Sequence, residues 1–280
     1  MSLVIDFHVH ISVYDTWYPH LIEWMQPMLP MDAKTFIDDT LTPDGARKFF
    51  REEAGVDYCV GLAEMSPITA GIMSNDAAIE LCRPIDFFIP FANVNPYLET
   101  DPAKELERCI CELGFKGLKM LPPYHHFYAN DKRLYRMYAL AQELHIPVMF
   151  HTGSSVFVGS RLKYGDPLFI DDIAVDFPDL VLVMSHSGRG FWYDAAFFLA
   201  SYHENVYMEI AGLPPQYLLK YFPNLEENAD KIIFGSDWPS IPHTKRNIEA
   251  IRQLPISDSA KDKILGENAA RILGLTQEGN

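Results

Sequence analysis

The chain has 280 residues, of which 48% are hydrophobic and 22% are charged. This length suits one large domain, and a (β/α)8 barrel needs about 250 residues. The 38 acidic residues outnumber the 23 basic ones, which gives a formal net charge of −15. So acidic a chain is not expected to bind nucleic acid or an anionic membrane surface.

The first residues, MSLVIDFHVH, run directly into an apolar strand. They lack the basic region and the cleavage site of a secretory signal. No apolar run approaches the roughly 18 residues that a membrane helix needs. Four cysteines are too few for a disulfide scaffold in a chain of this size. We therefore expect a cytoplasmic protein.

Eight short apolar runs alternate with amphipathic stretches along the chain. Runs of this kind are typical of strands buried on both faces, as in a parallel sheet. The clearest helical patterns between them cover residues 101–114, 131–145 and 257–273. Alternation of eight strands with helices predicts a single (β/α)8 TIM barrel over residues 1–280, and no G-x-G-x-x-G turn supports an open doubly wound sheet. The runs are 3–7, 56–64, 86–94, 115–120, 146–150, 180–184, 206–211 and 231–235.

A long insertion, residues 11–42, follows the first predicted strand and is rich in Trp, Tyr, Met and Pro. Loops of this length are uncommon unless they are functional. In a barrel it would lie at the C-terminal rim of the strands, where active sites are built. Two interpretations stay open here, a lid or substrate wall and a packed surface excursion.

His8 and His10 end the first predicted strand as an H-x-H motif. Because side chains alternate along a strand, both imidazoles are expected to point into the mouth of the barrel. Two nitrogens so placed can bind one metal ion at about 2.0–2.1 Å. On its own the motif is a weak signal, since alternating histidines also occur on exposed strands.

Three further polar residues end apolar strands in the same way. His151 follows IPVMF, His186 follows LVLVMS and Asp237 follows KIIFGS. In barrels, catalytic groups come from the C-terminal ends of several different strands. Together with the H-x-H motif, these residues predict a functional cluster at the rim.

The motifs of the chain, taken together, resemble those of the amidohydrolase superfamily, and within it the amidohydrolase-related family that includes aminocarboxymuconate-semialdehyde decarboxylase and lactone hydrolases. The resemblance covers nearly the whole chain, from residue 6 to residue 275. It specifies the superfamily but not one reaction. The segments that carry it are DFHVH, GFKGLKMLPPYHHFYAND, PVMFHTG, VMSHSG, IIFGSDWP and ILGENAARILGL.

The resemblance implies a single metal ion held by His8, His10, His151 and Asp237. It also implies that Asp237 takes a proton from metal-bound water and that His186 stands beside this water, which makes these two the catalytic residues. Zinc suits such nitrogen and oxygen ligands best, and Mn, Fe or Co are alternatives. A bound ion lowers the pKa of water to about 7 and so supplies hydroxide at neutral pH.

Lys119 ends the fourth predicted strand, where two-metal members of the superfamily carry a carboxylated lysine that bridges two ions. Single-metal members have G-x-K at this place without a bridge, so one metal or two stays open. We favour a role for Lys119 in binding a substrate carboxylate or in the structure, because an ammonium group prefers anionic partners.

Other residues of the predicted rim are candidates for contact with substrate. Tyr124 and His126 lie in the loop LPPYHH after the fourth strand, and Arg189 in SHSGRG can pair with a carboxylate. Glu64 ends the second strand and is expected to face the mouth. Asp6 has the same strand parity as His8 and is expected to orient a ligand from behind.

These residues predict a metal-dependent hydrolase that cleaves an ester, lactone or amide bond of a small carboxylated molecule. The alternative is a metal-dependent non-oxidative decarboxylase that uses the same ligands, and a further alternative is an inactive barrel. The ligands do not choose between the two reactions, and the substrate stays open. Residues 191–198, FWYDAAFF, are a candidate interface for a homodimer.

Overall fold

The computed structural model describes residues 2–275. Eight strands pair in parallel in the order β1-β2-β5-β6-β7-β8-β9-β10. The amides of Phe7 and Asp237 donate to the carbonyls of Phe234 and His8, each at 3.0 Å, and so close the sheet into a barrel. The predicted TIM barrel is confirmed, with each strand inside or overlapping its predicted run. The barrel strands are β1 (Ile5–His10), β2 (Tyr58–Leu62), β5 (Phe88–Asn93), β6 (Gly117–Met120), β7 (Val148–His151), β8 (Leu182–Ser185), β9 (Val206–Glu209) and β10 (Ile232–Ile233).

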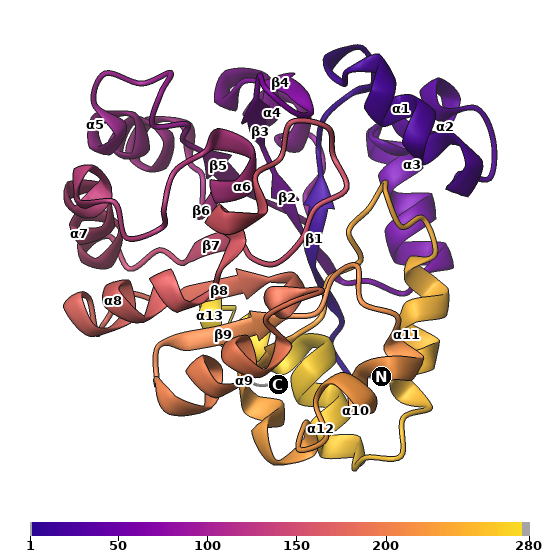
Figure 1. The fold of residues 1–280 in the computed structure, drawn as a ribbon. Coiled ribbons are helices and arrows are strands. Elements are labelled where there is room, and N and C mark those ends of the chain that lie inside the picture. Colours follow the sequence, from indigo (N-terminus) through magenta and orange to yellow (C-terminus); the bar gives the residue numbers. More distant parts are fainter. Residues whose placement is uncertain (1, 276–280) are drawn as a thin grey trace.

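Helices surround the barrel, and the insertion helices stand together beyond the C-terminal end of β1 in Figure 1. The α-helices are α1 (Pro19–Met25), α2 (Ala33–Thr40), α3 (Pro43–Ala46), α4 (Asn75–Cys82), α5 (Pro102–Glu107), α6 (Pro122–His125), α7 (Tyr135–Glu143), α8 (Leu168–Asp176), α9 (Tyr193–Tyr202), α10 (Leu218–Tyr221), α11 (Thr244–Arg252), α12 (Asp258–Asp262) and α13 (Asn268–Ile272). Short 3₁₀ or π segments extend several of them, among them η2 (Gln26–Met28), η3 (Arg47–Glu53), η4 (Arg108–Leu113) and η10 (Lys263–Glu267).

The ends of the predicted helices have the expected caps. The Asp101 side chain accepts a hydrogen bond from the Lys104 amide, and that of Ser257 accepts one from Ala260. Each satisfies a backbone donor that the first turn of a helix leaves free. Gly114 ends η4 in the left-handed region at φ 88°, where a residue without Cβ is not strained.

The insertion packs on a small hairpin that the sequence pattern did not predict. The hairpin pairs β3 (Glu64–Ser66) with β4 (Gly71–Met73) in antiparallel fashion. The Tyr18 amide donates to the carbonyl of Ala70 at 2.8 Å, and the Tyr18 hydroxyl donates to that of Pro67 at 2.9 Å. Strands of three residues leave too little alternation to be recognised. The hairpin fixes the insertion over one side of the rim.

A β-bulge in β1 separates two layers inside the barrel. Asp6 pairs with Cys59 and Val9 pairs with Gly61, so β1 has one residue more than β2 over this interval. The extra residue breaks the alternation of side chains. The expectation that Asp6 shares a face with His8 is therefore wrong, because the bulge lies between them. Asp6 still holds the strand end, since its Oδ1 accepts the amide hydrogens of His8 and Ser236.

The inside of the barrel below the bulge is apolar. The rings of Phe7 and Phe91 pack edge to face with centroids 5.5 Å apart. A Cβ on Gly117 would meet the Phe91 ring at 2.4 Å, so only glycine fits at this place in β6. We call this cluster the apolar layer; its buried barrel residues are Ile5, Phe7, Val60, Leu62, Phe91, Met149, Val183 and Ile233.

The surface bears on two predictions about partners. Among residues 2–275, no helix is both long enough and apolar enough to cross a membrane. Phe191 and Phe198, in the candidate dimer interface, are 70% and 63% exposed. A homodimer through this segment stays a prediction.

Candidate functional site

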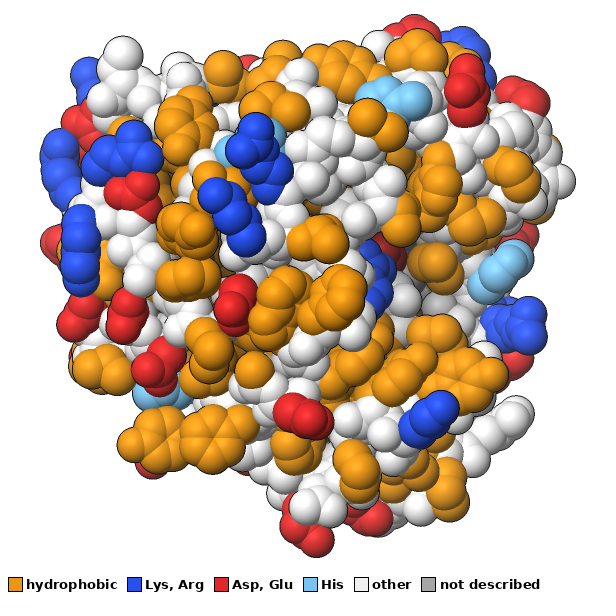
Figure 2. Space-filling model, in the orientation of Figure 1, with side chains coloured by type: hydrophobic (Ala, Val, Ile, Leu, Met, Phe, Trp, Pro, Cys, Tyr) orange, Lys and Arg blue, Asp and Glu red, His pale blue; other side chains and the backbone are white. Residues whose placement is uncertain are grey.

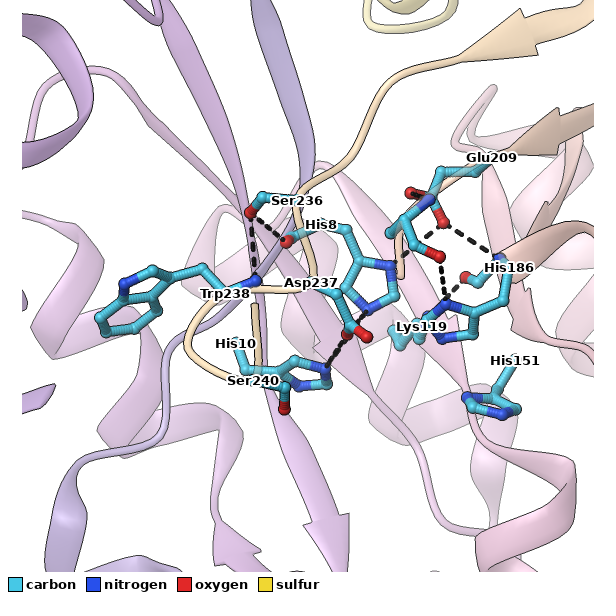
Figure 3. A network of polar contacts seen from close by, with 12 residues as sticks. His8, His10, Lys119, His151, His186, Glu209, Ser236, Asp237, Trp238 and Ser240 are labelled. Atoms are coloured by element: carbon cyan, nitrogen blue, oxygen red, sulfur yellow. Dashed lines mark hydrogen bonds and ion pairs between the residues drawn. The ribbon is translucent and has the colours of Figure 1, made fainter. Parts of the chain in front are cut away.

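His8, His10 and Asp237 point toward one another at the C-terminal end of the barrel (Figure 3). His8 Nε2 lies 3.3 Å from His10 Nε2, and Asp237 Oδ1 lies 3.4 and 3.5 Å from these two nitrogens. The His8 side chain is fully buried, and those of His10 and Asp237 are 9% and 12% exposed. Four tetrahedral ligands at 2.0–2.1 Å from an ion are separated from one another by about 3.3–3.4 Å. The triangle therefore has the dimensions of one face of a metal site.

The opposite ring nitrogens of these histidines face carboxylates. His8 Nδ1 lies 3.2 Å from Glu209 Oε2, and His10 Nδ1 lies 3.1 Å from Glu64 Oε2. A proton on each Nδ1 serves these contacts and leaves the Nε2 lone pairs directed at Asp237. Two lone pairs and a carboxylate that meet without a donor between them suit a cation, so the residues fit a divalent metal ion. Glu64 lies at the start of the hairpin strand β3 rather than at the end of β2, it is buried, and it does not line the cavity, so its expected place at the mouth stays a prediction.

His186 and His151 occupy the open side of the triangle. His186 Nδ1 donates to the Ala211 carbonyl at 2.8 Å, which frees its Nε2. One ligand atom each of His8, His186 and Asp237 lie within 4.8 Å of one another. The His151 ring packs against that of His186 with centroids 4.5 Å apart. The resemblance assigned His151 to the metal and His186 to the water, whereas this geometry brings His186 to the cluster as well.

Two of these residues have a backbone conformation that is costly outside glycine. His186 has φ 61° and Asp237 has φ 71°, both in the left-handed region. Such residues persist only where the surroundings hold them, and they concentrate at functional sites. The Asp237 amide donates to the His8 carbonyl, which fixes the turn after β10 against β1. The strained turns aim both side chains at the same point.

Glu209, at the end of β9, is a central residue of the site that sequence analysis missed. Besides His8 Nδ1 it accepts the amide hydrogens of His186 at 3.3 Å and Ala211 at 2.7 Å. Glu209 thus holds the imidazole ring of His8 and the backbone of His186. Burial raises the pKa of Glu209 to about 8, against the opposing charge of Lys119. The available signal was a carboxylate in the apolar run VYMEIA.

Lys119 lies beneath the cluster rather than in the cavity. Its ammonium group donates to the Ser185 hydroxyl and is 1% exposed. Burial lowers the pKa of Lys119 to about 8, although Glu209 and Asp237 favour its charged form. Lys119 is not among the residues that line the cavity, and this placement favours the structural interpretation over a role in binding substrate.

A cavity of about 280 Å³ opens from the cluster to the surface. Figure 2 shows a recess near the middle of this face, bordered mainly by hydrophobic side chains with a basic one at its edge. Arg189 is the only Lys or Arg among the described residues that line the cavity. The lining consists of His10, Trp24, Met28, Tyr124, His151, Ser154, Ser155, Val156, Phe157, His186, Arg189, Asp237, Ser240 and Ile241.

The candidate substrate contacts separate into two groups. Tyr124 and Arg189 line the cavity, whereas His126 does not. His126 Nε2 instead donates to the Gly159 carbonyl at 2.8 Å, and its ring stacks on Tyr164. The structure therefore gives the expected role of His126 in substrate binding no support.

Trp24 and Met28 belong to the insertion and line the cavity. The insertion therefore forms one wall of the cavity, which favours the substrate-wall interpretation.

The charges at the bottom of the cavity favour an ionised Asp237. Burial opposes ionisation, but a hydrogen bond from His10, whose proton a bound metal ion would replace, and the charge of Arg189 outweigh it and lower the pKa of Asp237. Arg189 Nη1 lies 3.8 Å from Asp237 Oδ2. In the absence of a ligand, the site holds a carboxylate able to accept a proton, with a guanidinium group beside it.

Comparison with known proteins agrees with this architecture. The profile of the amidohydrolase family matches residues 5–275. The chain belongs to this family, and it is an enzyme of the metal-dependent type that the family comprises.

Curated relatives include enzymes of two reaction types. The γ-resorcylate decarboxylase of Rhizobium sp. is 26% identical in an alignment that covers 72% of this chain and 75% of that protein. The 2-keto-4-carboxy-3-hexenedioate hydratase of Sphingobium sp. is 25% identical, over 97% of this chain and 96% of its own length. Neither of these relatives is named as a hydrolase.

Among solved structures, a dihydroxybenzoic acid decarboxylase from Polaromonas sp. has the same fold. It superimposes with a TM-score of 0.68 at 21% identity and covers 98% of both chains. That structure contains manganese and the inhibitor 2-nitroresorcinol.

Proposed function

We propose that this protein is a metal-dependent non-oxidative decarboxylase of a small molecule with a hydroxyl group next to its carboxylate. The observation that carries the proposal is the triangle of His8, His10 and Asp237 at the bottom of a small aromatic-lined cavity. Three of the four relatives found among curated proteins are γ-resorcylate decarboxylases, which supports this reaction over the hydrolysis expected from the sequence.

We assign the metal to His8, His10 and Asp237, with His151 and His186 on the open side. A divalent ion there would act as a Lewis acid that binds substrate oxygens and lowers the pKa of a hydroxyl group. Three imidazoles and a carboxylate suit zinc, while manganese is the ion in the related decarboxylase structure. Zinc and manganese are therefore the two ions to load.

The side chains around the metal have defined tasks in this reaction. Arg189 binds the substrate carboxylate through charge-assisted hydrogen bonds. The faces of Tyr124 and Phe157 hold an aromatic ring, since stacked rings gain about 0.5–1.5 kcal/mol beyond their buried area. A mostly apolar lining excludes water from the carbon that is protonated.

Asp237 is the proposed proton carrier. Ionised in the free protein, it accepts the proton of the substrate hydroxyl group and then gives it to the ring carbon that bears the carboxylate. The new C–H bond replaces the C–C bond to the carboxylate, and the electron pair of that C–C bond returns to the ring as carbon dioxide leaves. Solvent supplies the proton that restores the product hydroxyl.

A hydratase is the second candidate, because the hydratase relative matches almost the full length of both chains. The name of that enzyme's substrate implies three carboxylate groups. Apart from a bound metal ion, Arg189 is the single Lys or Arg on the described cavity wall, so only one of the three carboxylates would have such a partner. This contrast favours a monocarboxylate and hence the decarboxylase.

The test is to load the protein with zinc or manganese and supply 2,6-dihydroxybenzoate and related hydroxylated benzoates in D₂O. We expect carbon dioxide release and one deuterium at the carbon that carried the carboxylate. Asp237→Asn should lower the rate by about 10²–10⁴-fold, the usual contribution of a general acid–base group, with its far-UV circular dichroism unchanged.

The matched control is Asp194→Asn, which changes an exposed carboxylate on α9 and should leave the rate unaltered. Ester or lactone cleavage with proton release but no carbon dioxide would return the proposal to hydrolysis. Addition of water to an enoic acid would establish the hydratase.

A further inference from the structure

Two aromatic side chains from distant segments close the outer side of the cavity. Trp24 belongs to α1 in the insertion, and Phe157 belongs to the loop between β7 and α8. Their rings meet edge to face with centroids 5.6 Å apart. The Phe157 ring also lies 5.4 Å from that of Tyr124, which in turn lies 4.8 Å from that of His151. A continuous row of rings thus runs from the cavity mouth to the metal cluster.

The position of Phe157 is fixed by its loop. The Phe157 amide donates to the Ser155 hydroxyl at 3.1 Å, and the Phe157 carbonyl accepts from Ser160 at 2.7 Å. Ser155 donates to the Tyr124 hydroxyl at 3.1 Å, which ties the loop to α6. At the base of the loop, the Ser154 amide donates to the Arg189 carbonyl at 2.7 Å. A wall held by so many bonds limits what the cavity admits.

The insertion side of the wall is also anchored. Ser240, after β10, contacts Met25 of α1 through its hydroxyl at 3.6 Å from the sulfur. Met28 of η2 lines the cavity beside Trp24. Neither side of the Trp24–Phe157 contact is therefore a free loop tip.

We propose that Trp24 and Phe157 determine the upper size limit of the substrate, which admits one six-membered ring and excludes a fused pair of rings. An apolar cavity of about 150 Å³ already holds benzene, so the cavity of about 280 Å³ has room for one substituted ring, and the two wall rings rather than the total volume set the limit on a second ring. A second fused ring has to extend away from the metal, and the row of rings occupies that space. The inference rests on the proposed function in one respect, that an aromatic carboxylate binds with its polar edge at the metal.

The test compares two probes that cannot lose carbon dioxide, 2-nitroresorcinol and 1-nitro-2-naphthol. Both present a nitro group next to a hydroxyl group, and they differ in the second ring. Isothermal titration calorimetry on the metal-loaded protein measures their affinities without turnover. We expect wild type to bind the single-ring probe at least tenfold more tightly than the two-ring probe.

The variants remove each half of the wall in turn. Phe157→Ala and Trp24→Ala should each reduce this affinity ratio at least tenfold, mainly by strengthening binding of 1-nitro-2-naphthol. Phe157→Leu and Trp24→Phe, which keep an apolar side chain, should reduce it less and serve if the alanine variants unfold. Val158→Ala is the control, since Val158 lies in the same loop but is exposed and does not line the cavity.

The outcomes separate this inference from the proposed function. Equal binding of both probes to wild type, failure of both to bind, or a ratio that every wall variant leaves unchanged would overturn the size limit. If the ratio changes as expected but no hydroxylated benzoate releases carbon dioxide, the decarboxylase proposal fails while the wall stands. If carbon dioxide is released and the ratio stays constant, only the wall is rejected.

Discussion

The inside of the barrel has two layers that are equally buried and chemically opposite. Below the bulge in β1 lies the apolar layer, or lower layer, in which Phe7 and Phe91 are fully buried and belong to one apolar cluster. Above it lies a polar layer, the upper layer, in which His8 and Glu209 are also fully buried and Lys119 is 1% exposed. The same eight strands carry both layers, so the difference comes from the residues at the C-terminal ends and from the bulge that turns β1 between them.

The comparison shows which kind of burial indicates function. Burial of Phe7 contributes to stability through the hydrophobic effect and needs no further explanation. Burial of a histidine or a carboxylate costs free energy unless partners compensate for the lost water. Glu209 has three hydrogen-bond donors as such compensation, yet burial still raises its pKa to about 8. The polar side chains of the upper layer are therefore candidates for chemistry, whereas those of the lower layer stabilise the fold.

The largest effect on stability is expected in the lower layer. Phe7→Ala should reduce the free energy of unfolding by about 3–5 kcal/mol, because it removes a fully buried ring and leaves a cavity beside Phe91. Urea unfolding of the metal-free protein measures this loss. Metal affinity of the folded fraction should change little, because the bulge directs the Phe7 and His8 side chains into different layers although the two residues are neighbours in the chain.

A large loss of metal affinity in folded Phe7→Ala would contradict the separation of the two layers. Ile72→Ala provides a control for the size of the stability effect, because Ile72 on the hairpin is about half exposed and its truncation should cost little.

In the upper layer the expected effect falls on the metal instead. Above pH 8, where Glu209 with its pKa of about 8 is ionised, Glu209→Gln keeps the shape of the side chain but loses the charge that faces His8 Nδ1, and the affinity for zinc or manganese should fall about 10–100-fold. Competition with a chromophoric chelator measures the dissociation constant. Glu204→Gln, on the exposed loop before β9, is the matched control.

Unfolding of the same variant sharpens the contrast. Because burial disfavours the ionised form of Glu209, the neutral glutamine should leave the metal-free protein as stable as wild type or more stable. Equal metal affinity with reduced stability would place Glu209 with the supporting residues rather than with those that orient the ligands.

The barrel and the rim residues could be predicted because both follow from local rules. Alternating apolar runs and helices determine the fold class, and a polar residue directly after an apolar run determines which side chains reach the rim. His8, His10 and Asp237 meet for this reason. The exact ligand set was inferred from resemblance and stays a prediction.

What could not be predicted depends on contacts between distant segments. Glu209 was hidden inside a run that was expected to continue to residue 211, so it did not look like a strand end. The bulge in β1 changes the face of one strand without any signal in its apolar pattern. The meeting of Trp24 with Phe157 joins loops more than 130 residues apart, which no periodicity reports.

The smallest expected effect concerns His125, a buried residue beside the upper layer but outside the metal cluster. His125 Nε2 lies 3.1 Å from the Ser66 hydroxyl, and burial lowers the pKa of His125 to about 3. In the unfolded chain its pKa is about 6.5, so below that pH the unfolded state binds a proton that the folded state does not. Stability must therefore fall as the pH drops from about 6.5 toward 3, by up to about 1.4 kcal/mol per pH unit from this residue.

His125→Gln should remove the loss of stability at low pH that comes from this residue. Between pH 7.5 and pH 5.5, metal-free wild type should lose about 1 kcal/mol more unfolding free energy than the variant, measured by urea denaturation at each pH. The other buried histidines titrate in both proteins, so the difference isolates His125. His243→Gln, at an exposed position before α11, should retain the slope of wild type. A gap between wild type and His125→Gln that is the same at both pH values would mean that the folded protein accommodates a charged His125, and the polar region of the barrel would then be less closed to water than its burial indicates.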